Sequence, residues 1–369
     1  MNFEFSEELQ ALRAQAKSFL RKNGAKSARN ALENQSGFDR ALWESIADQG
    51  WIGAAIPEKF GGSEMGEEAL CVLADEIGAS LAAIPFASNA YIAAPALLHY
   101  GSEAQKTRYL PLIASGEAIF CLAHIENAGP PSAQSLGCYV SAGKLHGHKI
   151  PVIDGTIATH ALVSASAENG EIGLYIVALE AVEVVRESLI SVDPSRDLAK
   201  LSFEGAAAET LELAHGISAV TDILDRAAIP MAFEQIGGAQ SALEMARDYA
   251  LTRQAFGRSI ASFQAIKHKL AEVYVLIELA RSNAYYGAYA LASNAPDLTQ
   301  AAAASRIAAI KAFEKASQEN IQTHGGMGFT WEFDCHLYYR RAKHLSLALG
   351  AAGYWKDRLI SALESKNAA

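Results

Sequence analysis

The chain has 369 residues, half of them hydrophobic, which favours two or three domains with large buried cores. Its formal net charge of −10 argues against binding to nucleic acid or an anionic membrane surface, so local cations must hold any phosphate-bearing ligand. Four scattered cysteines, an acidic N-terminus and no apolar run near the roughly 18 residues of a membrane span predict a reduced, cytoplasmic protein without signal peptide or membrane helix.

Residues 1–115 show the periodicity of helices and predict an all-helical N-terminal domain. Ser6 followed by Glu7 and Glu8 is a plausible helix start, with a cap and acids in the first turn. Apolar residues then recur at helical spacing, and short glycine and proline breakers separate the later segments. These further helices are expected at residues 38–49, 66–82, 90–100 and 103–114.

Residues 116–213 change texture and predict a middle β domain, a barrel or sandwich. Val, Ile, Thr and Ser alternate in short runs such as 161–165 and 173–179. Turn sequences, Asn169-Gly170 and Asp193-Pro194-Ser195, separate these runs.

Helical periodicity returns in residues 214–369 and predicts an antiparallel four-helix bundle as the C-terminal domain. Pro230 either opens the first long helix or lies inside a helix that begins upstream. A last helix is expected after Trp331. The alanine-rich segments long enough to cross a domain are 231–254, 263–291 and 298–323.

Two short motifs in this last region carry the chemistry of a dinucleotide site. The first is RQAFG, from Arg253 to Gly257, followed by Gln264, and the second is QTHGGMGF, beginning at Gln322. Arginine offers a fork of donors matched to phosphate oxygens, and paired glycines let backbone amides approach an anion. A lone arginine at a helix end commonly complements the helix dipole, and a glycine commonly ends a helix, but the combination is more specific than either part.

The chain resembles the acyl-CoA dehydrogenase family nearly end to end, most densely at residues 56–62, 109–117 and the two motifs above. The resemblance implies an α+β multidomain fold with helical, β and bundle domains in this order, and FAD as cofactor. In that family the two motifs hold FAD in the active site of a neighbouring subunit. The implied cofactor-binding residues are Arg253, Phe256, Gln264, Gln322, Gly325 and Gly326.

The catalytic base of that family has no counterpart at its two usual positions. Removing hydrogen from an acyl thioester needs a base at the α-carbon and a flavin to accept hydride from the β-carbon. The matching positions here are Leu349 and Ala227, with only Asp225 near the second. Glu234 is the remaining candidate, but it lies two helical turns, about 10 Å, beyond Ala227. A buried glutamate in an apolar helix is more often structural, so the base is unassigned.

The β domain also departs from the family where flavin-ring contacts are expected. Residues 123–131 read AHIENAGPP in place of a Thr-Glu-Pro and Gly-Ser-Asp pattern. Ile125 and Ile153 replace threonines that donate hydrogen bonds, and Pro151 replaces a tryptophan. The chain therefore retains the half of the site that reaches a neighbour and has lost much of its own.

The favoured interpretation is a subunit of an FAD-dependent acyl-CoA dehydrogenase, paired with a second, catalytic acyl-CoA dehydrogenase-like subunit. Members acting on steroid side-chain thioesters assemble in this α2β2 manner. An acyl-CoA substrate and an electron-transfer flavoprotein or similar acceptor are implied. A self-sufficient homotetramer using Glu234, a flavin monooxygenase and a non-catalytic scaffold on the same fold remain alternatives. No metal site is expected, because His324, His336 and His344 match no ligand spacing.

Overall fold

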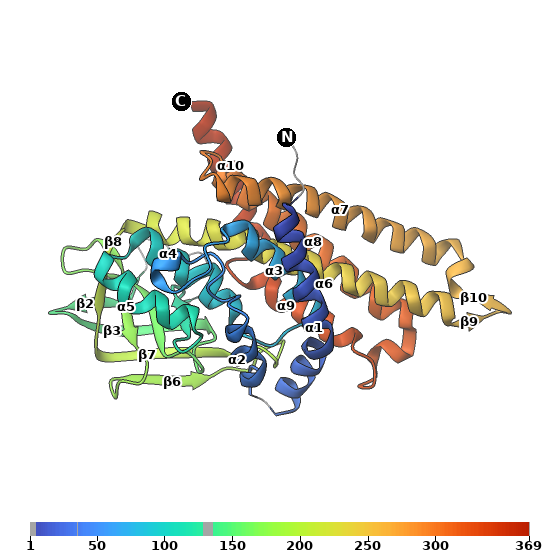
Figure 1. Cartoon of the computed structure of the whole chain (residues 1–369), viewed down its shortest axis with the longest axis horizontal. Helices are drawn as coiled ribbons and strands as arrows, with labels where there is room; N and C mark the ends of the chain where they lie inside the picture. Colours follow the sequence, from blue (N-terminus) through green and yellow to red (C-terminus); the bar gives the residue numbers. More distant parts are fainter. Residues whose placement is uncertain (1–4, 35, 128–135, 369) are drawn as a thin grey trace. The chain divides into compact units, whose positions relative to one another are not determined.

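The computed structural model describes residues 5–34, 36–127 and 136–368 (Figure 1). The chain divides into two compact units that interleave along the sequence. The helical unit comprises Met1–Arg29, Cys71–Ala82 and Ala228–Ala369, and the mixed unit comprises Asn30–Leu70 and Ala83–Ala227. No helix in the described part of the chain is long and apolar enough to span a membrane.

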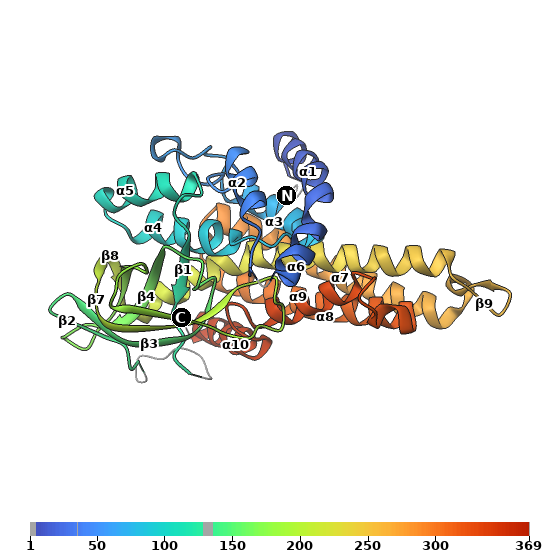
Figure 2. The same ribbon diagram turned by 90° about the horizontal axis from the view of Figure 1, so that it is seen from below.

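The helical unit is a bundle of long helices. Helix α6 ends just before the hairpin β9–β10, and α7 begins shortly after it (Figures 1 and 2). Alanine lines much of the bundle interior, which lets the helices approach closely. Residues of α1 and α3 within this unit pack on it. The bounds are α1 Glu7–Glu33, α3 Glu67–Ser80, α6 Gly216–Thr252, β9 Gln254–Ala255, β10 Arg258–Ser259, η3 Ile260–Ser262, α7 Gln264–Ala292, α8 Leu298–His324, η4 Gly325–Phe329, α9 Cys335–Leu347 and α10 Ala352–Ala368.

Glycines set the contact between α3 and α6 in the helical unit. A Cβ added to Gly78 would lie 1.8 Å from the carbonyl oxygen of Glu234, and one added to Gly237 would lie 1.8 Å from that of Asp75. Neither position accepts a side chain without moving backbone. This contact fixes Asp75 and Glu234 in place on facing helices.

The mixed unit combines short helices with one sheet. Two helices have well-defined N-caps: the Asp39 side chain accepts the Leu42 amide of α2, and Ser102 and Gln105 form a capping box on α5. The helical bounds are α2 Arg40–Asp48, η1 Glu58–Phe60, the π-helical η2 Ala87–Ala93, α4 Ala94–Tyr100 and α5 Glu103–Ala114.

The sheet has the strand order β6-β7-β3-β2-β4-β5-β8, with β1 pairing in parallel with β4. Most other pairs are antiparallel, and β3 pairs with β7 over most of its length. Alternate side chains such as Leu145, Val163 and Leu201 form its core. The strands are β1 Phe120–Ala123, β2 Tyr139–Ser141, β3 Lys144–Ile153, β4 His160–Ser166, β5 Ile172–Ala178, β6 Val184–Ser188, β7 Leu198–Ala207 and β8 Glu209–His215.

The predicted fold class is confirmed, with one correction. Of the two alternatives for Pro230, the second holds: the helix begins upstream, at Gly216, and the proline lies inside α6. The single helix expected after Trp331 is wrong, because Leu349 and Gly350, both with positive φ, separate α9 from α10. The domain boundaries near residues 115 and 213 remain a prediction.

Candidate functional site

Arg253 directly follows the last residue of α6 and begins the β9–β10 hairpin. Its amide donates to the Tyr249 carbonyl over 2.8 Å, and its carbonyl accepts the Ile260 amide over 2.9 Å. Phe256 and Gly257 form the two-residue turn with φ of 54° and 77°, the sign that a tight hairpin turn requires at both positions. The Phe256 side chain is 94% exposed at the tip.

The glycine motif follows α8, whose last residue is His324. Gly325 adopts a φ of 58° and its amide donates to the Gln322 carbonyl, which ends the helix. A Cβ added to Gly326 would meet nothing within 4 Å, and Gly326 has no positive φ. Gly328 differs, since a Cβ there would lie 2.6 Å from the Ile321 carbonyl. Packing and backbone conformation thus explain Gly325 and Gly328 but not Gly326.

Two contacts bring these motifs to the same end of the bundle. The Tyr249 ring, one turn before Arg253, stacks on His324 with centroids 4.1 Å apart. Near the start of α7, Lys269 lies 3.2 Å from the Glu319 carboxylate, one turn before the end of α8. These contacts therefore bring together the end of α6, the start of α7 and the end of α8, which carry the two motifs.

The polar side chains of the two motifs are exposed. Arg253 and Gln264 extend from the α6–α7 connection, and Gln322 lies on the last turn of α8. Their side chains form no hydrogen bond or ion pair with any described residue. Exposed apolar side chains follow the glycine motif in the sequence, among them Phe329, which is 87% exposed, and Trp331. We call Arg253, Phe256, Gln264, Gln322, Gly325 and Gly326 the bundle-end set.

Glu234 lies in the interior of the helical unit, 1% exposed, beside the buried Arg306. The Arg306 guanidinium donates to Gln235 Oε1 and to the carbonyls of Leu345 (2.9 Å) and Ala348 (2.7 Å). Burial lowers the pKa of Arg306 to about 9, and the Glu234 charge opposes that shift. Glu234 is therefore placed as the electrostatic partner of a buried arginine.

The two positions at which the resemblance places a base are apolar and buried. Leu349 has a φ of 60° between α9 and α10, and Ala227 is inaccessible within α6. Asp225 is also buried. The structure therefore offers no carboxylate at either aligned position.

In the mixed unit a buried ion pair lies where flavin contacts are expected from the family. Lys149 Nζ on β3 donates to Glu126 Oε1 over 2.7 Å and to Ser164 Oγ over 3.2 Å. The Glu126 carboxylate also accepts the amides of Gly137 and Cys138. Burial alone would raise the pKa of the Glu126 carboxyl. The hydrogen bonds from Lys149, Gly137 and Cys138 together outweigh burial, so the pKa is lowered. Residues 128–131 of the altered AHIENAGPP stretch lie outside the described residues.

His124, next to this pair, is held neutral. Burial, followed by the Lys149 charge, lowers the pKa of His124 to about 4. Sequence reasoning missed Lys149, which carries no motif, although a lysine within a strand of alternating apolar residues is unusual.

The end of β3 is held by other groups of the same unit. Ser88 Oγ donates to Asp154 Oδ2 over 2.6 Å, and Arg196 lies 3.6 Å from the same oxygen. Asp197 accepts the Thr156 amide over 2.7 Å. Ile125 and Ile153 are half-buried and Pro151 is exposed. We call these two ion pairs, Glu126–Lys149 and Asp154–Arg196, the buried network.

The histidines do not converge on a metal site. His324 is stacked on Tyr249 and hydrogen-bonded to the Asn320 carbonyl (2.9 Å), while His336 stacks on Trp331. No group of three metal-ligand side chains occurs among the described residues.

Comparison with known proteins shows the family of the chain. Residues 6–117 match the acyl-CoA dehydrogenase N-terminal domain and residues 214–362 the C-terminal domain. Acyl-CoA dehydrogenase IpdE2 of Mycobacterium tuberculosis is 33% identical over 91% of each chain.

Two solved structures share the fold over nearly the whole chain. A variant of the Tcur3481-Tcur3483 steroid ACAD superposes with a TM-score of 0.89 at 29% identity, covering 98% of this chain and 99% of that one. The ChsE4-ChsE5 complex from Mycobacterium tuberculosis gives a TM-score of 0.90 at 24% identity, covering 99% of each chain. The chain belongs to the acyl-CoA dehydrogenase family.

Proposed function

We propose that this chain is a subunit of an FAD-dependent acyl-CoA dehydrogenase and contributes FAD phosphate contacts across an interface to a catalytic partner. The reaction is the α,β-dehydrogenation of an acyl-CoA thioester. The observation that carries the proposal is that the side chains of Arg253, Gln264 and Gln322 are exposed and form no hydrogen bond or ion pair with any described residue, whereas the chain's own base positions are apolar. The likeness to a steroid ACAD supports a bulky thioester substrate.

The bundle-end residues fit a dinucleotide pyrophosphate. Arg253 supplies a charge-assisted donor pair, and Gln264 and Gln322 supply carboxamides beside it. Gly326 has open space where any side chain would stand, so a ligand can approach the backbone on that side. Bound flavin would accept hydride from the substrate β-carbon. The residues of this chain would bind and orient its phosphates.

The division of labour places proton removal on the partner subunit. Leu349 and Ala227 offer no base, and Glu234 is engaged electrostatically with Arg306. The exposed rings of Phe256 and Phe329 would be covered by the same partner, which excludes water from the phosphate contacts. Electrons would pass on to an electron-transfer flavoprotein or similar acceptor.

The test is the visible absorbance spectrum of the purified chain, alone and co-expressed with a candidate partner. The proposal expects colourless protein alone and stoichiometric flavin in the complex. Flavin in the isolated chain, together with thioester oxidation, would instead support a self-sufficient homomer. A lack of flavin in every pairing would favour a scaffold.

A further inference from the structure

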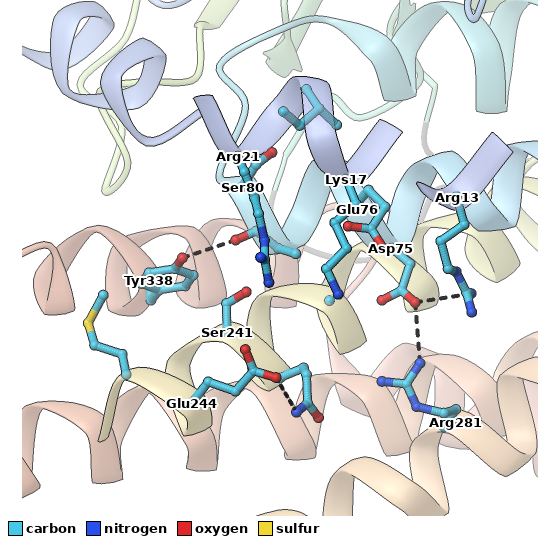
Figure 3. Close-up of a pocket in the computed structure, with 15 residues that line it drawn as sticks. Arg13, Lys17, Arg21, Asp75, Glu76, Ser80, Ser241, Glu244, Arg281 and Tyr338 are labelled. Carbon is cyan, nitrogen blue, oxygen red and sulfur yellow. Dashed lines mark hydrogen bonds and ion pairs between the residues drawn. The ribbon is translucent and has the colours of Figure 1, made fainter. Parts of the chain in front are cut away.

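A pocket of about 480 Å³ lies within the helical unit and is separate from the bundle-end set. Its walls come from α1, α3, α6, α7 and α9, so five segments distant in sequence enclose it (Figure 3). The volume exceeds that of an inorganic ion and falls in the range of small-molecule sites.

Three cations line one face of α1 at intervals of one helical turn. Arg13, Lys17 and Arg21 are four residues apart, so their side chains share one face. Arg13 is committed, because Asp75 Oδ2 accepts from it over 3.3 Å and from Arg281 over 3.2 Å. Lys17 and Arg21 have no ion pair within 4 Å among the described residues, and both point into the pocket (Figure 3).

The opposite wall supplies neutral polar groups. Ser241 lies on α6 and faces the pocket beside Tyr338 of α9 (Figure 3). The Tyr338 hydroxyl donates to the Ala79 carbonyl over 3.0 Å, and the Gln240 amide donates to Glu244 over 2.9 Å. A molecule with an anionic end and a polar body therefore meets complementary groups on both sides.

The lining has four cationic side chains and three carboxylates, so one cation is in excess when every carboxylate is ionised and two are in excess when Glu76 is neutral. Two arginines share the Asp75 carboxylate, and Glu244 is satisfied by Gln240. Glu76 is the carboxylate facing Lys17 and Arg21. Burial, and then the Asp75 charge, raise the pKa of Glu76 to about 7, so near neutrality much of the population carries no charge there. The pocket is locally cationic within a chain of net charge −10.

We propose that this pocket binds a small organic anion. The ligand is a metabolite with a phosphate or carboxylate group, and this charged group lies between Lys17 and Arg21. Its polar remainder contacts Ser241 and Tyr338. Lys17 and Arg21 are exposed to solvent, form no ion pair within 4 Å among the described residues and line a cavity of molecular size, so both are available to an anionic ligand. This site does not depend on the flavin role of the bundle-end set.

The test measures binding of three probes to the full-length chain by calorimetry at pH 6.5. The probes are AMP, succinate and inorganic phosphate, each compared with chloride at equal ionic strength. Lys17→Gln and Arg21→Gln are each expected to weaken binding about tenfold, the scale of one charge-assisted hydrogen bond. Lys22→Gln, which changes an exposed neighbour on α1, is expected to bind as wild type does.

The probes and a background substitution separate the possible outcomes. Tighter AMP than succinate binding assigns a phosphate ligand, and the reverse assigns a carboxylate ligand. The measurements are repeated with Arg253→Ala, so that binding at the flavin phosphate contacts is not counted. Absence of binding by all three probes, or equal weakening in Lys22→Gln, would overturn the site while leaving the proposed function untouched.

The pH dependence gives a second, independent readout. When Glu76 ionises it competes with the ligand for Lys17 and Arg21. Wild-type affinity for succinate, whose carboxylates ionise at lower pH than the second phosphate proton, should therefore fall about tenfold from pH 6 to pH 8. Glu76→Gln should bind at pH 8 as tightly as wild type does at pH 6, and an unchanged pH profile in this variant would contradict the assignment. The other charged or titratable groups around Glu76 are Arg13, Lys17 and Arg21 on α1, Asp75 on α3, Glu244 on α6, Arg281 on α7 and Tyr338 on α9.

Discussion

The side chains of Arg253, Gln264 and Gln322 are exposed and form no hydrogen bond or ion pair with the described residues, whereas those of Glu126 and Lys149 are buried and bonded to each other. Exposed donors that are never satisfied internally cost little in water and are free to serve a ligand. Buried charges must be paired by the protein itself, which leaves them unavailable to a cofactor. The two regions therefore differ in whether their polar side chains are satisfied within the chain, and the proposed function rests on this difference.

The largest effect is expected from breaking the buried network. Lys149→Met leaves the Glu126 carboxylate without its counter-ion, and such losses typically cost about 3–5 kcal/mol of unfolding free energy. Denaturant unfolding measures it. The matched control is Lys200→Met, which removes an exposed pair with Glu187 and should cost less than about 1 kcal/mol. Equal effects of the two substitutions would show that the buried pair is not a structural element.

The dependence of stability on pH should distinguish the buried region from the exposed one, through His124. Its pKa is lowered from 6.5 to about 4 in the folded state, so between these values the unfolded chain binds the extra proton. Stability is therefore lost as pH falls from 6.5 to 4, by about 3 kcal/mol at most. In His124→Gln this part of the decline should disappear from unfolding curves measured across that range. Parallel profiles in the two proteins would refute the assignment.

At the bundle end the expected loss is of flavin rather than of stability. Arg253→Ala removes one charge-assisted phosphate contact, about 1.5–3 kcal/mol, or roughly tenfold or more in FAD affinity. FAD is first released from the complex, and the FAD-free complex is then titrated with FAD. Arg247→Ala is the control, since that arginine is exposed on α6 and pairs with Asp248 (2.8 Å). Unchanged FAD content in Arg253→Ala would remove the cross-subunit role.

The sequence predicts the helices better than the buried network, and the reason is local. Residues 103–114 were expected as a helix and form α5, because Ser102 and Gln105 mark its start within four residues. The Glu126–Lys149 pair joins residues 23 apart, brought together by the fold rather than by a motif. Helix α6 runs through Pro230 because packing outweighs local preference. The motifs of the bundle-end set were visible because one short sequence carries each.

Two glycines of one motif sharpen the distinction between ligand and packing. Gly326→Ala should leave the unfolding free energy within about 1 kcal/mol, since its Cβ meets nothing, yet should weaken FAD binding in the complex. Gly328→Ala should instead destabilise the chain by about 1–3 kcal/mol through its contact with the Ile321 carbonyl. Thermal unfolding and FAD titration of both variants give the comparison. A Gly326→Ala complex with native flavin affinity would make that glycine irrelevant to the cofactor.

The smallest expected effect is on turnover, from Glu234→Gln. The substitution keeps the shape of the side chain but removes the charge beside Arg306, so a modest loss of stability is expected. Because the base is assigned to the partner, kcat of the assembled complex should change by less than about tenfold, or 1.4 kcal/mol in the barrier. Steady-state kinetics with the thioester measures it, alongside the unfolding curve. A fall of several decades in kcat with the fold intact would make Glu234 the base and place the chemistry on this chain. The apolar Leu349 and Ala227 would then mark a displaced base and not a catalytic partner.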